Sequence, residues 1–190
     1  PCPRAAGVNG WQLPTTISVA GQAFVIRSDF RAVLAACRAL NAPDLDPTEQ
    51  AACCLRILVP RWRELPDPQQ AVEQLMIFIN LGQPIPEHQP PRPQLIDWEG
   101  DAGLIAPAVD RVLGYSCRRC SYLHWWEFVG AYTNIGQGLL ADVVNVRRKR
   151  AKGKKLEPWE KEFVRENPEL VHIEKPLTDE EAAFFRQLGV

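Results

Sequence analysis

The chain has 190 residues, of which 46% are hydrophobic and 24% charged, and its formal net charge at pH 7 is −1. This length can bury a substantial core without disulfides or metals, and the composition is ordinary for a globular protein. No stretch reaches the roughly 18–20 apolar residues that a membrane helix needs, and no apolar run follows the first basic residue as in a secretory signal. The sequence therefore predicts a soluble protein with no membrane partner.

The first predicted elements are a flexible arm over residues 1–12 and a short β-hairpin after it. Apolar residues alternate with polar ones on both sides of Gly21, which marks a turn. These alternating residues are Ile17, Val19, Phe24 and Ile26. Because a lone hairpin is only marginally stable in water, we expect it to pack on another element.

Three helices are predicted next. From Ser28 the apolar residues follow helical spacing. Two later helices share a start signal, with Asp as N-cap, Pro in the first turn, and Glu or Gln three residues after the cap. The two signals are Asp46-Pro47-Thr48-Glu49 and Asp67-Pro68-Gln69-Gln70. The first of these helices should run to about Val59, and the second should end at Gly82.

Residues 83–96 form a proline-rich crossover, since proline fixes φ and removes a backbone donor. Its five prolines are Pro84, Pro86, Pro90, Pro91 and Pro93. The crossover either separates two subdomains or spans one helical body. We favour one body over residues 13–166, because neither half has many core residues alone.

Four helices are expected after the crossover. Asp97 should cap the first, which ends at Gly114 and which Pro107 should kink or break. The second opens near Ser121 and holds an aromatic cluster. The third carries Leu139, Leu140, Val143, Val144 and Val146 into a basic segment, and Glu157-Pro158-Trp159 opens the fourth. Residues 167–190 read as a C-terminal tail with a short helix that opens at Thr178. The predicted fold class is mainly α, a helical domain with a short N-terminal β-hairpin.

The aromatic cluster is the most distinctive local feature. Trp125 and Trp126 are adjacent, and successive helical residues diverge by about 100°, so both rings cannot face one core. One ring should fill the core while the other packs against a neighbouring segment or a partner. Nearby His124 has no triad or metal signature with it, so a hydrogen-bonded structural role is favoured over a catalytic one. The sequence shows no active site, and we predict that the protein is not an enzyme and needs no cofactor.

Cysteine spacing offers one weak metal signal. Cys117 and Cys120 have the spacing of half a zinc site or of a redox dithiol, and the flanking Arg118 and Arg119 would favour thiolates. No second Cys-x-x-Cys or matching histidine pair completes four zinc ligands, so local packing is the favoured reading. The other cysteines in helical patterns behave as small hydrophobes, which favours a reducing cytoplasm.

Charge is unevenly distributed along the chain. Residues 147–155 carry seven positive charges and no acid, so the rest of the chain sums to −8, which is −1 minus 7. The seven are Arg147, Arg148, Lys149, Arg150, Lys152, Lys154 and Lys155. Neither a nucleic-acid motif nor interleaved aromatic residues accompany them, so a solvated face is expected and nucleic acid is not an expected partner.

Three stretches of the sequence together resemble a known family. The first is Leu13-Pro14-x-x-Ile17 with Gly21 and Phe24-x-Ile26-x-Ser28-Asp29-Phe30-Arg31, and the second is Leu65-Pro66-Asp67 with the helix that follows to Gly82. The third is Asp97-Trp98-Glu99-x-Asp101-Ala102-x-x-Ile105 with Leu123-His124-Trp125-Trp126-x-Phe128. Their order and spacing resemble the phage tail proteins named after phage gene product fifteen, over roughly residues 13–165. Pro107 and the segment from Cys117 to Cys120 depart from that pattern.

The resemblance implies a tail-assembly chaperone of a phage or prophage with a long tail, acting in the host cytoplasm. Such a protein coats the tape-measure protein until tail-tube subunits displace it, and it often forms homo-oligomers. The residues expected to line the binding groove are Leu123, His124, Trp125, Trp126 and Phe128. Two alternatives stay open: a structural virion component such as a tail-completion or connector protein, and a zinc- or redox-dependent protein that uses Cys117 and Cys120.

Overall fold

The computed structural model describes residues 11–84 and 93–173. Within these residues the chain forms eight α-helices, one 3₁₀ helix and one two-stranded antiparallel sheet, which confirms the mainly α class with an N-terminal hairpin. The chain divides into two compact units. Unit 1 comprises Pro1–Pro91 and Ile105–Gly136, and unit 2 comprises Arg92–Leu104 and Gln137–Val190. The division does not follow the proline-rich crossover alone, because the chain changes unit again within the helix that contains Pro107.

The hairpin consists of β1 (Thr16–Val19) and β2 (Gln22–Val25). Positive φ at both Ala20 (49°) and Gly21 (77°) gives the two-residue turn that suits the twist of paired strands. Ala20 is held in this conformation by its N–H, which donates to Gln70 Oε1 at 2.6 Å. The hairpin thus packs on the helix that contains Gln70, as its marginal stability required.

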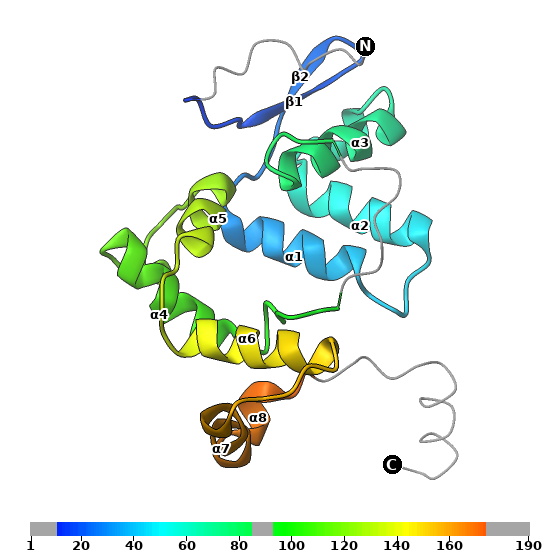
Figure 1. The fold of residues 1–190 in the computed structure, drawn as a ribbon. Helices are drawn as coiled ribbons and strands as arrows, with labels where there is room; N and C mark the ends of the chain where they lie inside the picture. The colour runs from blue at the N-terminus through cyan, green and yellow to red at the C-terminus, as the bar shows by residue number, and fades with distance from the viewer. Residues whose placement is uncertain (1–10, 85–92, 174–190) are drawn as a thin grey trace. The chain divides into compact units, whose positions relative to one another are not determined.

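Unit 1 is built mainly from helices. They are α1 (Phe30–Leu40), α2 (Pro47–Leu58), η1 (Trp62–Glu64), α3 (Pro68–Ile79), most of α4 (Ala102–Leu113) and α5 (Trp125–Thr133). In Figure 1, α1 and α2 run side by side, and α5 packs on α1. Their fully buried residues include Val33, Leu58, Leu75 and Val109.

The predicted helix starts at Asp46 and Asp67 are both correct, with one difference. Asp46 and Glu49 form the expected reciprocal capping box on α2. Asp67 accepts from the Gln70 N–H at 3.0 Å, but the Gln70 side chain does not return to Asp67. Instead, its Oε1 accepts from the Ala20 N–H of the hairpin. The residue expected to complete the local capping box therefore makes a long-range contact.

Three helix predictions need correction. α4 begins at Ala102 and not at Asp97, because residues 98–101 form a turn in which Asp97 accepts from the Glu99 N–H at 3.0 Å. Pro107 lies inside α4 without breaking it; it only lacks the N–H that would reach the Gly103 carbonyl. α5 begins at Trp125 and not near Ser121. The residues before it are extended because they pair with the backbone of residues 28–30.

Unit 2 contains α6 (Leu139–Ala151), α7 (Pro158–Glu166) and α8 (Pro168–Val171), with α8 packed on both of the others. The predicted helix at Glu157-Pro158 is confirmed, whereas α8 lies in what was predicted to be a tail. The buried residues of unit 2 include charged side chains as well as aliphatic ones: Asp101, Leu140, Val143, Val146, Arg147, Glu160 and Val171. Residues 1–10 of the arm expected over residues 1–12, most of the proline-rich crossover and the helix expected at Thr178 lie outside the described residues.

Candidate partner-binding site

Two of the stretches that carry the family resemblance meet in unit 1. The backbone N–H of Phe30 donates to the Leu123 carbonyl at 2.9 Å, and the N–H of Trp125 donates to the Ser28 carbonyl at 2.8 Å. These bonds form an antiparallel bridge in which Asp29 lies opposite His124. Asp29 is the N-cap of α1 and His124 is the N-cap of α5, so the bridge fixes two helix starts against each other. We call residues 28–31 and 122–125 the N-cap joint.

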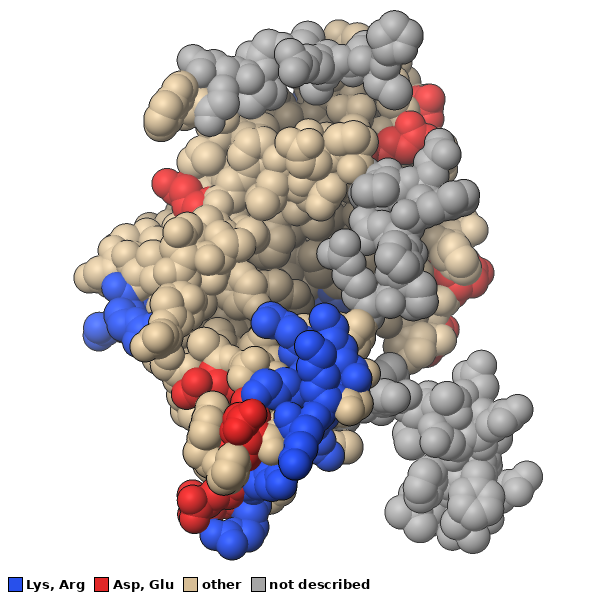
Figure 2. Space-filling view, viewed as in Figure 1, with Lys and Arg blue, Asp and Glu red and all other residues tan. Residues whose placement is uncertain are grey.

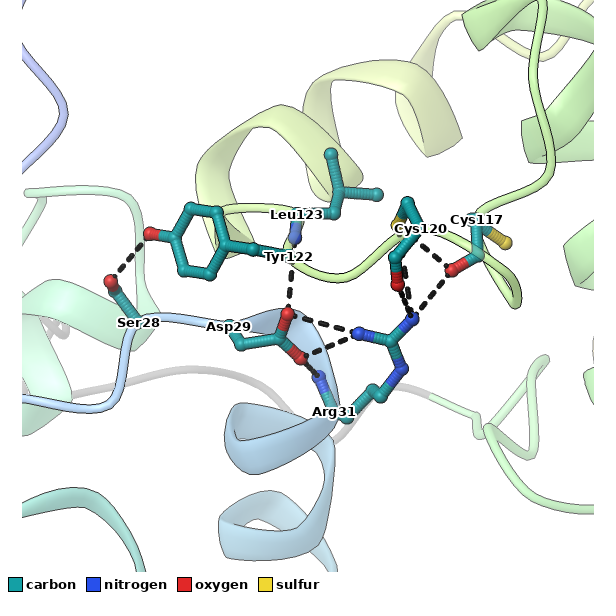
Figure 3. Close-up of polar contacts among 7 residues, drawn as sticks. All are labelled: Ser28, Asp29, Arg31, Cys117, Cys120, Tyr122 and Leu123. Carbon is teal, nitrogen blue, oxygen red and sulfur yellow. Dashed lines mark hydrogen bonds and ion pairs between the residues drawn. The ribbon is translucent and has the colours of Figure 1, made fainter.

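Asp29 connects both sides of the N-cap joint. Its Oδ1 accepts from the Arg31 N–H at 3.0 Å, which caps α1, and its Oδ2 accepts from the Leu123 N–H at 3.0 Å. Next to it the hydroxyls of Ser28 and Tyr122 lie 2.7 Å apart (Figure 3). One carboxylate therefore satisfies donors from two segments 94 residues apart.

Arg31 connects the N-cap joint to the turn over residues 117–120, which we call the cysteine turn. Its guanidinium pairs with Asp29 at 3.0 Å and donates to the carbonyls of Cys117 and Cys120, both at 2.8 Å (Figure 3). A planar guanidinium has several donors in fixed directions, which suits it to hold two carbonyls and a carboxylate at once. Apart from the presence of Arg31 in the first resembling stretch, no sequence pattern indicated this role.

The two adjacent tryptophans cover the end of α3. The Nε1–H of Trp125 donates to the Ile79 carbonyl and that of Trp126 to the Phe78 carbonyl, both at 2.9 Å. Carbonyls in the last turn of a helix lack i+4 partners within the helix. The Phe78 carbonyl also accepts from the Leu81 N–H at 3.1 Å, so Trp126 gives it a second donor, while Trp125 supplies a donor to the Ile79 carbonyl. Trp125 is buried and Trp126 is half-buried, which agrees with the prediction that one ring fills the core while the other packs on a neighbouring segment.

Gly82 is required at the point where the chain leaves α3. Its φ is +80°, and a Cβ there would lie 3.1 Å from Cη2 of Trp126. A side chain would therefore be strained by the backbone and crowded by the indole. This close approach explains why the second resembling stretch ends in glycine.

His124 has the structural role that the sequence favoured. Its Nε2 lies 2.9 Å from the Pro14 carbonyl oxygen, and its Nδ1 accepts from the Trp126 N–H at 3.1 Å. A carbonyl only accepts, so Nε2 carries a hydrogen and donates to Pro14, while Nδ1 is the acceptor. With both nitrogens bonded and 1% of the residue exposed, the imidazole offers no free nitrogen to a substrate.

The residues expected to line a groove lie mostly inside unit 1. Leu123, His124, Trp125 and Phe128 are buried, and Phe128 stacks on Phe30 with ring centroids 4.4 Å apart. Their contacts therefore stabilise the packing of α5 on α1 and α3. Direct contact with a partner stays a prediction, and Trp126 is the member that solvent reaches.

Cys117 does not favour the thiolate, contrary to the expectation from Arg118 and Arg119. Burial raises the pKa of Cys117 to about 11, and its hydrogen bond to Asp110 adds to this rise. The positive charge of Arg118 acts in the opposite direction but has a smaller effect. Over residues 11–84 and 93–173, no three His, Cys, Asp or Glu side chains are placed to hold a metal ion.

Two of the seven basic residues of the segment over residues 147–155 are used inside unit 2. Arg147 pairs with Asp101 through two bonds of 2.6 and 2.9 Å, with both side chains buried, and also donates to the Leu95 and Leu170 carbonyls. The expectation of a wholly solvated basic face is therefore wrong for Arg147. The sequence did contain a signal, since Arg147 falls at helical spacing with Leu140 and Val143 on the buried side of α6.

Lys149 is the second internal cation. It pairs with the buried carboxylate of Glu160 on α7 at 2.7 Å, and Glu160 also accepts from Asn145 and from the Glu157 N–H. The Lys149 bond, followed by the Glu157 N–H, lowers the pKa of Glu160 against the opposing effect of desolvation. This carboxylate therefore stays ionised and ties α6 to the start of α7.

No family model matches the chain, and no curated protein or solved structure shows significant similarity to it. Among the described helices, none combines the length and apolar character needed to cross a membrane.

Proposed function

We propose that this protein is a phage tail-assembly chaperone that binds the tape-measure protein during tail morphogenesis in the host cytoplasm. The observation that supports the proposal is the convergence of the resembling stretches. Ser28-Asp29-Phe30-Arg31 and the string from Leu123 to Phe128 form the N-cap joint and its aromatic packing. The stretch that opens α3 leads to the helix end under the two tryptophans. These parts of the three stretches lie in unit 1, whereas the part of the third stretch from Asp97 to Ala102 lies in unit 2.

The proposed binding mode is a helix of the partner packed against the partly exposed ring of Trp126. A tape-measure protein is long, helical and rich in apolar residues, and an amphipathic helix binds through residues at i, i+3, i+4 and i+7. In this mode Trp126 contacts the partner, while the buried residues of the string set its position. Many weak sites along one partner, occupied by an oligomer of this chain, give avidity and still allow tail-tube subunits to displace it.

The test is co-expression with the tape-measure protein of the same phage. A soluble complex that forms only when this chain is present supports the proposal. Trp126→Ala should lose the complex, whereas Tyr115→Ala, which removes an aromatic ring that is 48% exposed elsewhere in unit 1, should keep it. Circular dichroism of both variants checks that they are folded, and Trp126→Phe separates loss of the ring from loss of the indole donor.

Two results would contradict the proposal. If the tape-measure protein stays insoluble and unbound, the chaperone function is wrong. If the chain is found in purified phage particles, the alternative of a structural virion component, such as a tail-completion or connector protein, takes its place. If folded Trp126→Ala still binds the tape-measure protein, the proposed function stands and only the assignment of the contact to Trp126 is wrong.

A further inference from the structure

The five remaining cations of the segment form one exposed cluster at the end of α6. They are Arg148, Arg150, Lys152, Lys154 and Lys155, which we call the basic cluster. All five are exposed, and none forms an ion pair with another described residue. Figure 2 shows Lys and Arg side chains gathered in this region. Two buried acids of unit 2, Asp101 and Glu160, already form ion pairs with Arg147 and Lys149.

The backbone under the basic cluster has a defined conformation. Gly153, with φ +62°, ends α6, the Lys154 N–H donates to the Lys149 carbonyl at 2.9 Å, and the Gly153 N–H donates to the Arg150 carbonyl at 3.0 Å. These two bonds are the Schellman motif, which closes a helix and turns the following residues back over its end. The positions of the five cations are therefore set by a helix and its cap, and α7 begins soon after them.

We infer that the basic cluster binds the phosphate backbone of duplex nucleic acid without reading its sequence. Duplex DNA carries one phosphate charge per about 1.7 Å of its axis when both strands are counted, so it offers a dense array of acceptors to five exposed cations. This inference goes beyond the proposed chaperone function and reverses the expectation that nucleic acid is not a partner.

The composition of the basic cluster favours this partner over a protein or a single strand. Three of its five residues are lysines, and the residues that lie between its members are Lys149, Ala151 and Gly153. Protein interfaces are depleted of lysine at their centres and enriched in aromatic residues, and the cluster contains three lysines and no aromatic residue. Single strands bind through stacking on aromatic rings, and no aromatic residue lies within residues 148–155.

The test is fluorescence anisotropy of a labelled DNA duplex of about 20 base pairs, titrated with the full chain from low to moderate salt. With five phosphate contacts, the slope of log K against log salt should be about −4.5. Lys154→Gln/Lys155→Gln should weaken binding about tenfold or more at low salt and reduce the slope by about 2. Arg119→Gln/Lys161→Gln makes the same change in net charge at two exposed sites outside the basic cluster and should bind like the parent.

Four outcomes would overturn the inference. They are no binding by the parent chain at low salt, equal weakening by the control pair, equal affinity for polyglutamate, and equal affinity for phosphatidylserine vesicles. The third outcome would point to an acidic protein and the fourth to a membrane surface. All variants keep Arg147 and Lys149, so the internal pairs of unit 2 stay intact and a loss of binding is not a loss of folding.

Discussion

The two units join their helices with different chemistry. In unit 1 the N-cap joint uses backbone groups, hydroxyls and the partly exposed ion pair of Asp29 with Arg31, and indole donors close the end of α3. In unit 2, Arg147 and Asp101 form a buried ion pair, and Lys149, whose side chain is 26% exposed, pairs with the fully buried Glu160. Water can solvate a partly exposed charge that loses its partner, whereas a buried charge without its partner is expensive. The comparison predicts that unit 2 is the more sensitive to single substitutions and to acid.

The largest effect is expected from breaking the buried pair of unit 2. Arg147→Met leaves Asp101 as an uncompensated buried charge and should lower the free energy of unfolding by about 3–5 kcal/mol. Arg148→Met, one residue away and exposed, should change it by less than about 0.5 kcal/mol. Urea denaturation followed by circular dichroism measures both. The double variant Arg147→Met/Asp101→Leu should recover much of the loss, and no recovery would contradict the charge explanation.

A smaller loss is expected in the N-cap joint. Asp29→Ala removes the cap of α1 and leaves the Leu123 N–H without its acceptor, which should cost about 2 kcal/mol. Asp46→Ala removes a cap that serves only α2 and should cost about 1 kcal/mol. Equal losses in urea denaturation would mean that the bond across the joint adds nothing.

The indole caps of α3 should contribute less again. Trp126→Phe keeps an aromatic ring but removes the donor to the Phe78 carbonyl, with an expected loss of about 1 kcal/mol. Trp159→Phe, at a residue that is 50% exposed, should be nearly neutral. Thermal unfolding of the two variants side by side makes the comparison, and an equal effect would remove the capping role of Trp126.

Acid should weaken unit 2 through Glu160. Its folded-state pKa is lowered, first by Lys149, so its contribution is full above the unfolded-state pKa of about 4.3 and is lost as pH falls through the lower folded-state value. Glu160→Gln should flatten the fall in stability below about pH 5. Unfolding measured across this range tests the sign, and an unchanged acid limb would contradict it.

The sequence predicted what is local and missed what depends on distant partners. The caps at Asp46 and Asp67 were correct because the cap residue and the N–H groups it binds lie within three residues. The start of α5 was placed too early because the extended backbone before Trp125 is held by Ser28 and Phe30. Nothing in the local pattern of residues 121–125 contains that information.

The same limit applies to the charged residues. The seven cations within residues 147–155 look equivalent in the sequence. In the structure Arg147 and Lys149 form ion pairs with buried acids, whereas the other five form no ion pair with a described residue. The helical stripe of α6 marked Arg147, but the partner of Lys149 depends on where α7 packs. The sequence likewise did not show how far the predicted site residues are exposed, since His124, Trp125 and Phe128 are all buried.

The central claim is that the two resembling stretches around Phe30 and Phe128 form one structural joint. The most direct test is a double-mutant cycle with Phe30→Leu and Phe128→Leu, because the rings stack with centroids 4.4 Å apart and an interplanar angle of 9°. Urea denaturation of the parent, the two single variants and the double variant should give a coupling energy of about 0.5–1.5 kcal/mol. Strictly additive losses would show that the two stretches do not stabilise each other, and would contradict the account.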